Sequence, residues 1–213
     1  YQRQDHVFRS GEAVSLEVIV KTLEAVGISR LIAFDLHSVK IPEVFKIPVT
    51  HLSALPRFAQ EIRSRGWNTS DTVLVSPDMG GIRRIKILSD LLGGMPFAAI
   101  EKERDLSSGK VKALGIEGEV ARRAIIVDDM ISSGFTMVKA AELLSEEGSE
   151  EIYVFATHAV FSAEAPRLLQ NSKIQDVFVM DTVYIPLDKY FSKLTVLTVA
   201  DIIAKTIREK ILR

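Results

Sequence analysis

The chain has 213 residues, enough for one large domain or for one domain with part of a second, and 47% apolar with 26% charged residues is typical of a globular protein. Its 27 basic and 28 acidic residues leave a formal net charge of −1, so no global field attracts nucleic acid or an anionic membrane, and we expect neither partner. The absence of cysteine excludes disulfides and thiolate metal sites and is compatible with a reducing compartment, which predicts a cytoplasmic location.

Hydropathy gives no sign of a membrane segment, because no apolar run approaches the roughly 18 residues of a membrane span. The chain opens at Tyr1 without an initiator methionine. We therefore expect that residues upstream have been removed or belong to another piece.

Strands and helices alternate along most of the chain. Apolar residues at helical spacing predict a first helix over 14–26, ended by Gly27, and a short buried strand follows at 31–34. The later elements are expected in this order: helix 53–65, strand 72–75, helix 81–92, strand 97–100, strand 123–127, helix 135–147, strand 151–156, helix 163–170, strand 176–180 and helix 199–213. Continuous apolar strands separated by helices predict an α/β fold, a parallel sheet with helices on both faces.

Residues 101–121 break this alternation. The segment is charged, contains three glycines and has no clear period, although it stands where a crossover helix is expected. Such a long excursion at the end of a strand is typical of a functional flap. Ligands of open α/β sheets bind at the carboxyl ends of the strands, where this chain has polar clusters at 35–37, 76–81, 101–104 and 128–136.

The strongest motif runs from a buried strand through Asp128 and Asp129 into a loop of small residues and then a helix. A loop of this kind presents backbone N–H groups at a helix N-terminus, which suits a phosphate monoester. Carboxylates do not bind phosphate, so the two acids suit the vicinal hydroxyls of a sugar or a hydrated cation. Together these features indicate a ribose phosphate. We expect His6, His51 and His158 to be structural or solvated, and Trp67 to be a packing residue.

The loop resembles the phosphoribosyl-diphosphate loop of type I phosphoribosyltransferase folds, and its neighbours narrow the resemblance to the ribose-phosphate diphosphokinase (phosphoribosyl-pyrophosphate synthetase) family. Five further segments resemble motifs of that family in the same order, and the resemblance runs over nearly the whole chain. These are Tyr1-Gln2-Arg3-Gln4-Asp5, Asp35-Leu36-His37, Ser76-Pro77-Asp78-Met79-Gly80-Gly81, Glu101-Lys102-Glu103-Arg104 and Ala156-Thr157-His158.

The resemblance implies transfer of the diphosphoryl group of Mg-ATP to the 1-hydroxyl of ribose 5-phosphate, which gives 5-phosphoribosyl 1-diphosphate and AMP. It implies Mg²⁺ as the cofactor, ATP and ribose 5-phosphate as partners, and a homo-oligomer. Lys102 is then the residue that stabilises the transition state, and Arg104 contacts a substrate phosphate.

The same resemblance implies that Arg3 and Gln4 contact ATP and that His37 and Asp78 lie near the Mg-nucleotide. Because Mg²⁺ prefers oxygen ligands and keeps its waters, Asp78 suits the metal directly, whereas His37 suits a water or a phosphate. The residues implied to bind ribose 5-phosphate are Arg104, Asp128, Asp129, Ser132, Ser133, Gly134, Phe135 and Thr136.

Two positions of the loop depart from the common bacterial pattern. Ser132 replaces an aspartate, and Phe135 replaces a small residue, so its ring has to point away from the phosphate. Family members also consist of two similar α/β halves. On that pattern, residues 1–48 with helix 199–213 are a remnant of the N-terminal half, and 49–198 form the C-terminal half that carries the loop.

Two other functions use the same fold. A nucleobase phosphoribosyltransferase has the same loop but no Arg-Gln-Asp segment, so Arg3-Gln4-Asp5 argues against it. A non-catalytic regulatory homologue is expected to have lost the catalytic cations, and Lys102 and Arg104 argue against that alternative.

Overall fold

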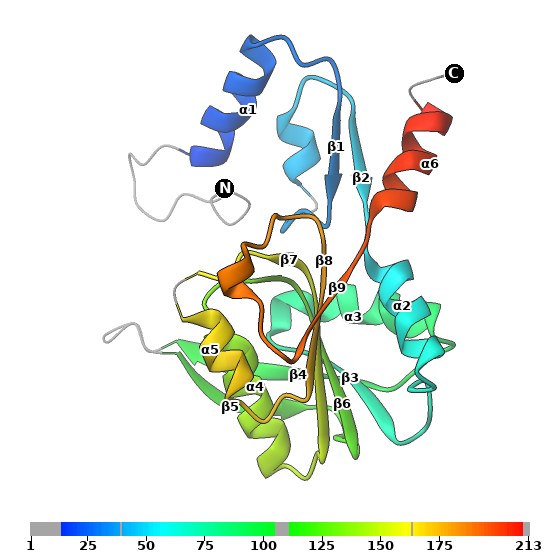
Figure 1. Cartoon of the computed structure of the whole chain (residues 1–213), viewed down its shortest axis with the longest axis vertical. Helices are drawn as coiled ribbons and strands as arrows, with labels where there is room; N and C mark the ends of the chain where they lie inside the picture. The colour runs from blue at the N-terminus through cyan, green and yellow to red at the C-terminus, as the bar shows by residue number, and fades with distance from the viewer. Residues whose placement is uncertain (1–13, 39, 105–110, 163, 211–213) are drawn as a thin grey trace. The chain divides into compact units, whose positions relative to one another are not determined.

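The structure, a computed structural model, describes residues 14–38, 40–104, 111–162 and 164–210, with the backbone alone at 102–104 and 111–114. The chain forms two compact units, Tyr1–Ala54 and Leu55–Arg213 (Figure 1). Arg3 and Gln4, the predicted nucleotide contacts, lie outside the described residues. The last helix groups with the second unit, and the assignment of 199–213 to an N-terminal half stays a prediction.

The first unit is built around one amphipathic helix and two short strands. Its elements are helix α1 (Ser15–Ala25), strand β1 (Leu31–Phe34), a 3₁₀ turn (Ile41–Val44) and strand β2 (Val49–Leu52). The strands pair in parallel, with Leu31 opposite Val49. Leu16 and Val20 of α1 pack against Ile41, because residues four apart share one face of a helix.

The second unit contains a seven-stranded sheet in the order β5-β4-β3-β6-β7-β8-β9. All pairs are parallel except β4 with β5, so the predicted parallel sheet is confirmed with one antiparallel edge strand. The strands are β3 (Thr72–Ser76), β4 (Phe97–Arg104), β5 (Val111–Glu117), β6 (Arg123–Ile131), β7 (Glu151–Ala159), β8 (Asp176–Met180) and β9 (Leu194–Leu197).

Helices cover both faces of this sheet, as predicted (Figure 1). They are α2 (Leu55–Ser64), α3 (Ile82–Leu91), α4 (Phe135–Glu146) and α5 (Ala165–Gln170). The second unit also contains helix α6 (Ala200–Lys210) and short 3₁₀ turns at Met79–Gly81 and Leu187–Lys189. On one face, α4 and α5 pack through Ala141 and Leu169. On the other face, the ring of Phe58 in α2 packs edge to face against the ring of Phe155, with the ring centroids 5.3 Å apart. No helix in the described part of the chain is long and apolar enough to cross a membrane.

Residues 101–121, for which the sequence showed no clear period and suggested a flap, form regular structure where the structure describes them. Strand β4 continues to Arg104, and β5 returns antiparallel to it at the edge of the sheet. The register shifts between Glu101 and Lys102, which is a bulge in the pair. An edge hairpin therefore replaces the crossover helix, and its charged side chains are typical of an edge strand.

Two strand ends are also corrected. We predicted that β6 ends at 127 and β7 at 156, but they pair as far as Ile131 with Ala159. The polar residues at these ends therefore belong to strands, because main-chain pairing continues beyond the apolar run. The sequence analysis also missed the four-residue strands β2 and β9.

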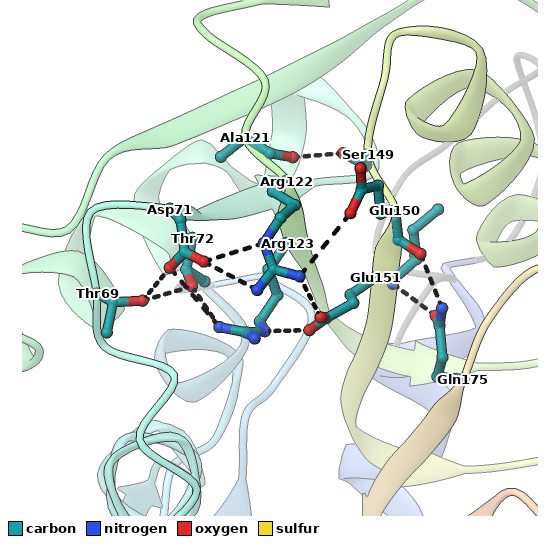
Figure 2. A network of polar contacts seen from close by, with 11 residues as sticks. Thr69, Asp71, Thr72, Ala121, Arg122, Arg123, Ser149, Glu150, Glu151 and Gln175 are labelled. Carbon is teal, nitrogen blue, oxygen red and sulfur yellow. Dashed lines mark hydrogen bonds and ion pairs between the residues drawn. The ribbon is translucent and has the colours of Figure 1, made fainter.

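An ion cluster joins the amino ends of β3, β6 and β7, at the opposite edge from the predicted ligand site (Figure 2). Arg122 pairs with Asp71 at 3.0 Å and with Glu151, and Arg123 pairs with Glu151 at 2.7 Å. The strand starts are thereby tied to one another. Nearby, the predicted packing role of Trp67 is borne out by its stacking on Tyr153, with ring centroids 4.0 Å apart.

Candidate functional site

The loop 132–134 connects β6 to the N-terminus of α4. Gly134 adopts φ = 78°, in the left-handed region that favours glycine, and is buried. A Cβ at this position meets Leu169 Cγ at 3.4 Å and Ala165 Cα at 3.5 Å. The backbone conformation therefore favours glycine here, whereas an added Cβ would make only ordinary contacts with α5.

Residues 161 and 162 form main-chain hydrogen bonds with the end of β6 and the start of the loop. Ser162 N donates to the carbonyl oxygen of Ser132 at 3.0 Å, and the two serine hydroxyls lie 3.2 Å apart. Phe161 N donates to the carbonyl oxygen of Ile131 at 3.1 Å, and Phe161 is a fully buried residue held at φ = 42°. Such a strained conformation persists only where the surroundings determine it, so this support is stiff.

The helix start that follows the loop faces solvent. Ser133 is exposed, Thr136 is half-buried, and Phe135 is 55% exposed with its ring 5.7 Å from Lys139 Nζ on the next turn. The phenylalanine ring thus lies on the outer side of α4. The first N–H groups of a helix have no intrahelical partner and carry the positive end of the helix dipole, so this start suits an anion.

The two acids of β6 are buried and share one arginine. Arg84 Nη1 lies 2.9 Å from Asp128 Oδ1, and Arg84 Nη2 lies 3.5 Å from Asp129 Oδ1. The side chain of Asp129 is 1% exposed, and Asp129 N donates to Asp128 Oδ1 at 2.8 Å. One cation thus faces two carboxylates.

The pKa of Asp128 is raised to about 7, mainly by burial and also by the adjacent Asp129, although Arg84 acts to lower it. Burial penalises the charged carboxylate, and a second negative charge at short range does the same. Pairs of acids with a perturbed pKa are more common at functional sites than elsewhere, although structural ion pairs can produce the same effect.

The segment 76–81 forms a tight turn between β3 and α3. Asp78 Oδ1 accepts a hydrogen bond from Gly81 N at 3.2 Å, and Ser76 Oγ donates to the carbonyl oxygen of Asp78 at 2.6 Å. A Cβ on Gly81 collides with Ser76 Oγ and lies 3.4 Å from Arg84 Nη1. The second glycine of the motif therefore makes room for the Ser76 hydroxyl.

Lys102 and Arg104 lie at the end of β4, opposite Ala113 and Val111 of β5. Residues two apart in a strand share one face of the sheet, so the two positions are on the same side. The sheet order puts β4 next to β3 and β3 next to β6, so the ends of these strands meet at one edge.

The cluster 35–37 belongs to the first unit. Asp35 has φ = 33°, and its carboxylate accepts hydrogen bonds from Ser53 Oγ and Ala54 N, both at 2.8 Å. Leu36 N donates to His51 Nε2 at 3.0 Å, which gives His51 a structural partner, and His37 is exposed. Likewise, His158 Nδ1 lies 2.9 Å from Thr182 Oγ1.

Among the described residues, no group of three or more histidines, cysteines or acids is arranged to hold a metal ion. His37 lies in the first unit and Asp78 in the second. A lone carboxylate such as Asp78 fits a Mg²⁺ ion that arrives on nucleotide phosphates and keeps most of its waters.

Arg84 is the site residue that the sequence analysis missed. The signal was present, because Arg84 lies in the first turn of α3, where the helix dipole disfavours a cation. A basic residue at such a position needs a nearby acid.

An open sheet with a helix-start loop and paired acids at its carboxyl edge is the arrangement of an α/β phosphate-binding protein. Residues 97–212 match the family described as "Phosphoribosyl synthetase-associated domain". The chain is 36% identical over 208 residues to "Ribose-phosphate pyrophosphokinase" of Gloeobacter violaceus, covering 97% of the chain and 62% of the relative. It is 35% identical over 209 residues to "Ribose-phosphate pyrophosphokinase 1" of Streptococcus pyogenes, covering 97% and 65%.

The crystal structure of phosphoribosylpyrophosphate synthetase from Mycobacterium smegmatis is similar with a TM-score of 0.88 and 35% identity, over 98% of this chain and 67% of that one. The chain therefore belongs to the ribose-phosphate pyrophosphokinase family, which confirms the resemblance. It spans 62% to 65% of the length of the curated relatives named above.

Proposed function

We propose that the carboxyl edge of the second unit binds ribose 5-phosphate. The observation that carries this proposal is the loop 132–134, which joins two buried carboxylates to a solvent-facing helix start. The 5-phosphate binds at the N–H groups and hydroxyls of Ser132, Ser133, Gly134, Phe135 and Thr136. Asp128 and Asp129 accept hydrogen bonds from the vicinal hydroxyls of the sugar.

The bound sugar is the acceptor of a diphosphoryl group from ATP. The anomeric hydroxyl oxygen attacks the β-phosphorus, the bond from that phosphorus to the α,β-bridging oxygen breaks, and AMP leaves while the hydroxyl proton is released. Transfer of this kind depends on positioning and on neutralising charge. Lys102 neutralises the developing charge, and Arg104 holds a phosphate of the substrate.

Asp78 would hold, through its carboxylate, the Mg²⁺ that accompanies ATP. The assignments of His37 to the metal's water shell or a phosphate, and of Arg3 and Gln4 to the nucleotide, stay predictions. The metal supplies neutralisation of the phosphate charges when it is bound. The names of the relatives support this chemistry. A homo-oligomer and a cytoplasmic location stay predictions.

Calorimetric titration with ribose 5-phosphate tests the binding step, with ribose as the ligand that lacks phosphate. We expect saturable binding of the phosphorylated sugar and at least a hundredfold weaker binding of ribose, because the loop loses its charged ligand. Asp128→Ala should weaken the binding of ribose 5-phosphate by about tenfold, since hydrogen bonds to a charged group contribute about 1.5–3 kcal/mol. Unaltered affinity refutes the assignment.

AMP release from Mg-ATP, measured in the natural protein with and without ribose 5-phosphate, tests the transfer step. Lys102→Ala should lower turnover by about two to three orders of magnitude and leave sugar affinity unchanged, because a transition-state contact acts on the rate. Sugar binding without AMP release in the unaltered protein indicates the non-catalytic homologue instead.

A further inference from the structure

Arg84 connects two motifs that are 44 residues apart in the chain. It lies in the first turn of α3, directly after the turn 76–81, and its guanidinium pairs with both acids of β6. Its side chain is only 18% exposed, so water screens these pairs less than it screens surface pairs. The arginine thus tethers the start of α3 to the carboxylates of the proposed sugar site.

The placement of this cation is unfavourable without its partners. A helix N-terminus repels positive charge, and two adjacent buried carboxylates repel each other. The guanidinium reduces both repulsions. It is planar and has several N–H donors in fixed directions, so it can pair with both carboxylates at once. A lysine carries one compact ammonium group and cannot reproduce a contact from two separate nitrogens.

The glycine of the preceding turn lies close to this arginine. A Cβ on Gly81 would lie 3.4 Å from Arg84 Nη1, which is an ordinary contact, but it would collide with Ser76 Oγ. Gly81 is therefore needed for the turn that leads into the helix start where Arg84 lies.

We propose that Arg84 is a positioning residue of the sugar site, which orients Asp128 and Asp129 and favours the ionised form of Asp128, so that the two acids accept the vicinal hydroxyls of a pentose 5-phosphate. This inference rests on the proposed sugar-binding function. Arg84 itself touches the acids and acts through them.

A pH dependence follows from the groups that face Asp128, which are Asp129 on the same strand and Arg84 on α3. Burial and Asp129 raise the pKa of Asp128, and Arg84 opposes them. Loss of the guanidinium therefore raises this pKa further. Because only the ionised carboxylate accepts two hydroxyl hydrogen bonds, sugar binding then requires a higher pH.

The test is calorimetric titration of the 213-residue chain with ribose 5-phosphate between pH 6 and pH 9. Arg84→Gln should weaken binding at pH 7 by about tenfold and restore most of it at pH 9, which is a shift of about one unit in the midpoint. Arg84→Lys should recover part of the affinity. The matched control is Arg83→Gln, which makes the same change at an exposed neighbour and should leave the profile unchanged. The proposal is overturned if the pH profile of sugar affinity in Arg84→Gln equals that of the control, or if the affinity is lowered by the same factor at every pH.

A second measurement does not depend on sugar binding. The side-chain carboxyl carbon of Asp128, assigned by its absence in Asp128→Asn, is titrated by NMR in the ligand-free protein. We expect the midpoint to rise in Arg84→Gln, or in Arg84→Lys by a smaller amount if the first variant does not fold, and an unchanged midpoint overturns the proposal. If the unaltered protein binds no ribose 5-phosphate, the proposed function fails, and this titration still decides the role of Arg84.

Discussion

Gly134 is the residue at which conformation and function are most closely linked. Its φ of 78° and its contact with α5 predict that Gly134→Ala costs about 1–2 kcal/mol of folding stability and weakens ribose 5-phosphate binding at least tenfold. Urea denaturation and calorimetry measure the two effects.

Gly93 is the matched control for this change. It has φ = 87° with nothing within 4 Å of an added Cβ, so Gly93→Ala carries the backbone strain without the contact. We expect a comparable loss of stability and unchanged sugar affinity. Equal affinities in the two variants would contradict the role of the loop.

Asp128 should make the ligand-free protein less stable as the pH rises. Its folded pKa is raised from 3.8 to about 7, so the folded state holds this proton more tightly than the unfolded state. The cost of ionisation therefore develops between about pH 4 and pH 7. Asp128→Asn removes it, and we expect this variant to be more stable than the unaltered protein by about 1–3 kcal/mol at pH 7.5 and equally stable near pH 4.

Denaturation in urea at the two pH values measures this difference. Asp90→Asn, at an exposed acid of α3, is the control and should show no such dependence. A stability gain that is the same at both pH values would exclude ionisation as its cause. The prediction also means that the buried acid of the proposed sugar site lowers the stability of the fold, as is common in functional sites.

At the scale of elements, the ion cluster at the amino ends of the strands concerns stability. Partial burial acts to raise the pKa of Glu151, but hydrogen bonds from Arg122 and Arg123 hold it below its usual value. A lowered pKa stabilises the fold above the unfolded pKa of 4.5, and this contribution is lost as the pH falls through the folded pKa. Glu151→Gln should therefore cost about 1 kcal/mol at pH 7, and the cost should disappear progressively as the pH falls below 4.5.

Thermal unfolding at pH 7 measures this cost as a fall of about 2–4 °C in Tm. Glu119→Gln, at an exposed acid in the connection between β5 and β6, should leave the Tm unchanged. An equal fall in both variants would mean that the cluster adds nothing specific. Sugar affinity should be unchanged in Glu151→Gln, because the cluster lies at the far edge of the sheet.

Sequence periodicity predicted those elements that bury a continuous apolar run. Strand β3 and helix α4 are examples, because hydrophobic burial decides both their type and their place. Periodicity did not predict the strands whose place in the sheet is determined by main-chain pairing. Strand β5 is paired with β4 and has no apolar pattern of its own. In the short strands β2 (VTHL) and β9 (LTVL), polar residues interrupt the apolar run, unlike in β1 (LIAF), which was predicted.

The site was predictable in its motifs but not in its contacts. The loop 132–134 and the acids Asp128 and Asp129 stand together in sequence, so a single motif reveals them. Arg84 and the supporting Ser162 meet these residues only in the folded chain, across 44 and 30 residues. The place of Arg84 at a helix start indicates that it needs an acid, but no local pattern indicates which acid.

At the scale of the molecule, the two units divide the proposed residues unequally. The loop 132–134, the acids, Arg84, Asp78 and the hairpin with Lys102 all lie in the second unit, which also contains the complete seven-stranded sheet. His37 lies in the first unit. Sugar binding and nucleotide binding should therefore be separable by removal of one unit.

We predict that residues 55–213, produced alone, bind ribose 5-phosphate within about threefold of the affinity of the whole chain. The core that supports the loop, including Met137, Ala165 and Leu169, is built within this unit, so the loop keeps its support when the first unit is removed. Calorimetry measures the affinity, and cooperative thermal unfolding first establishes that the fragment is folded. A folded fragment without sugar affinity would show that the first unit contributes to the pentose site, whereas retained binding without AMP release would limit its contribution to the nucleotide.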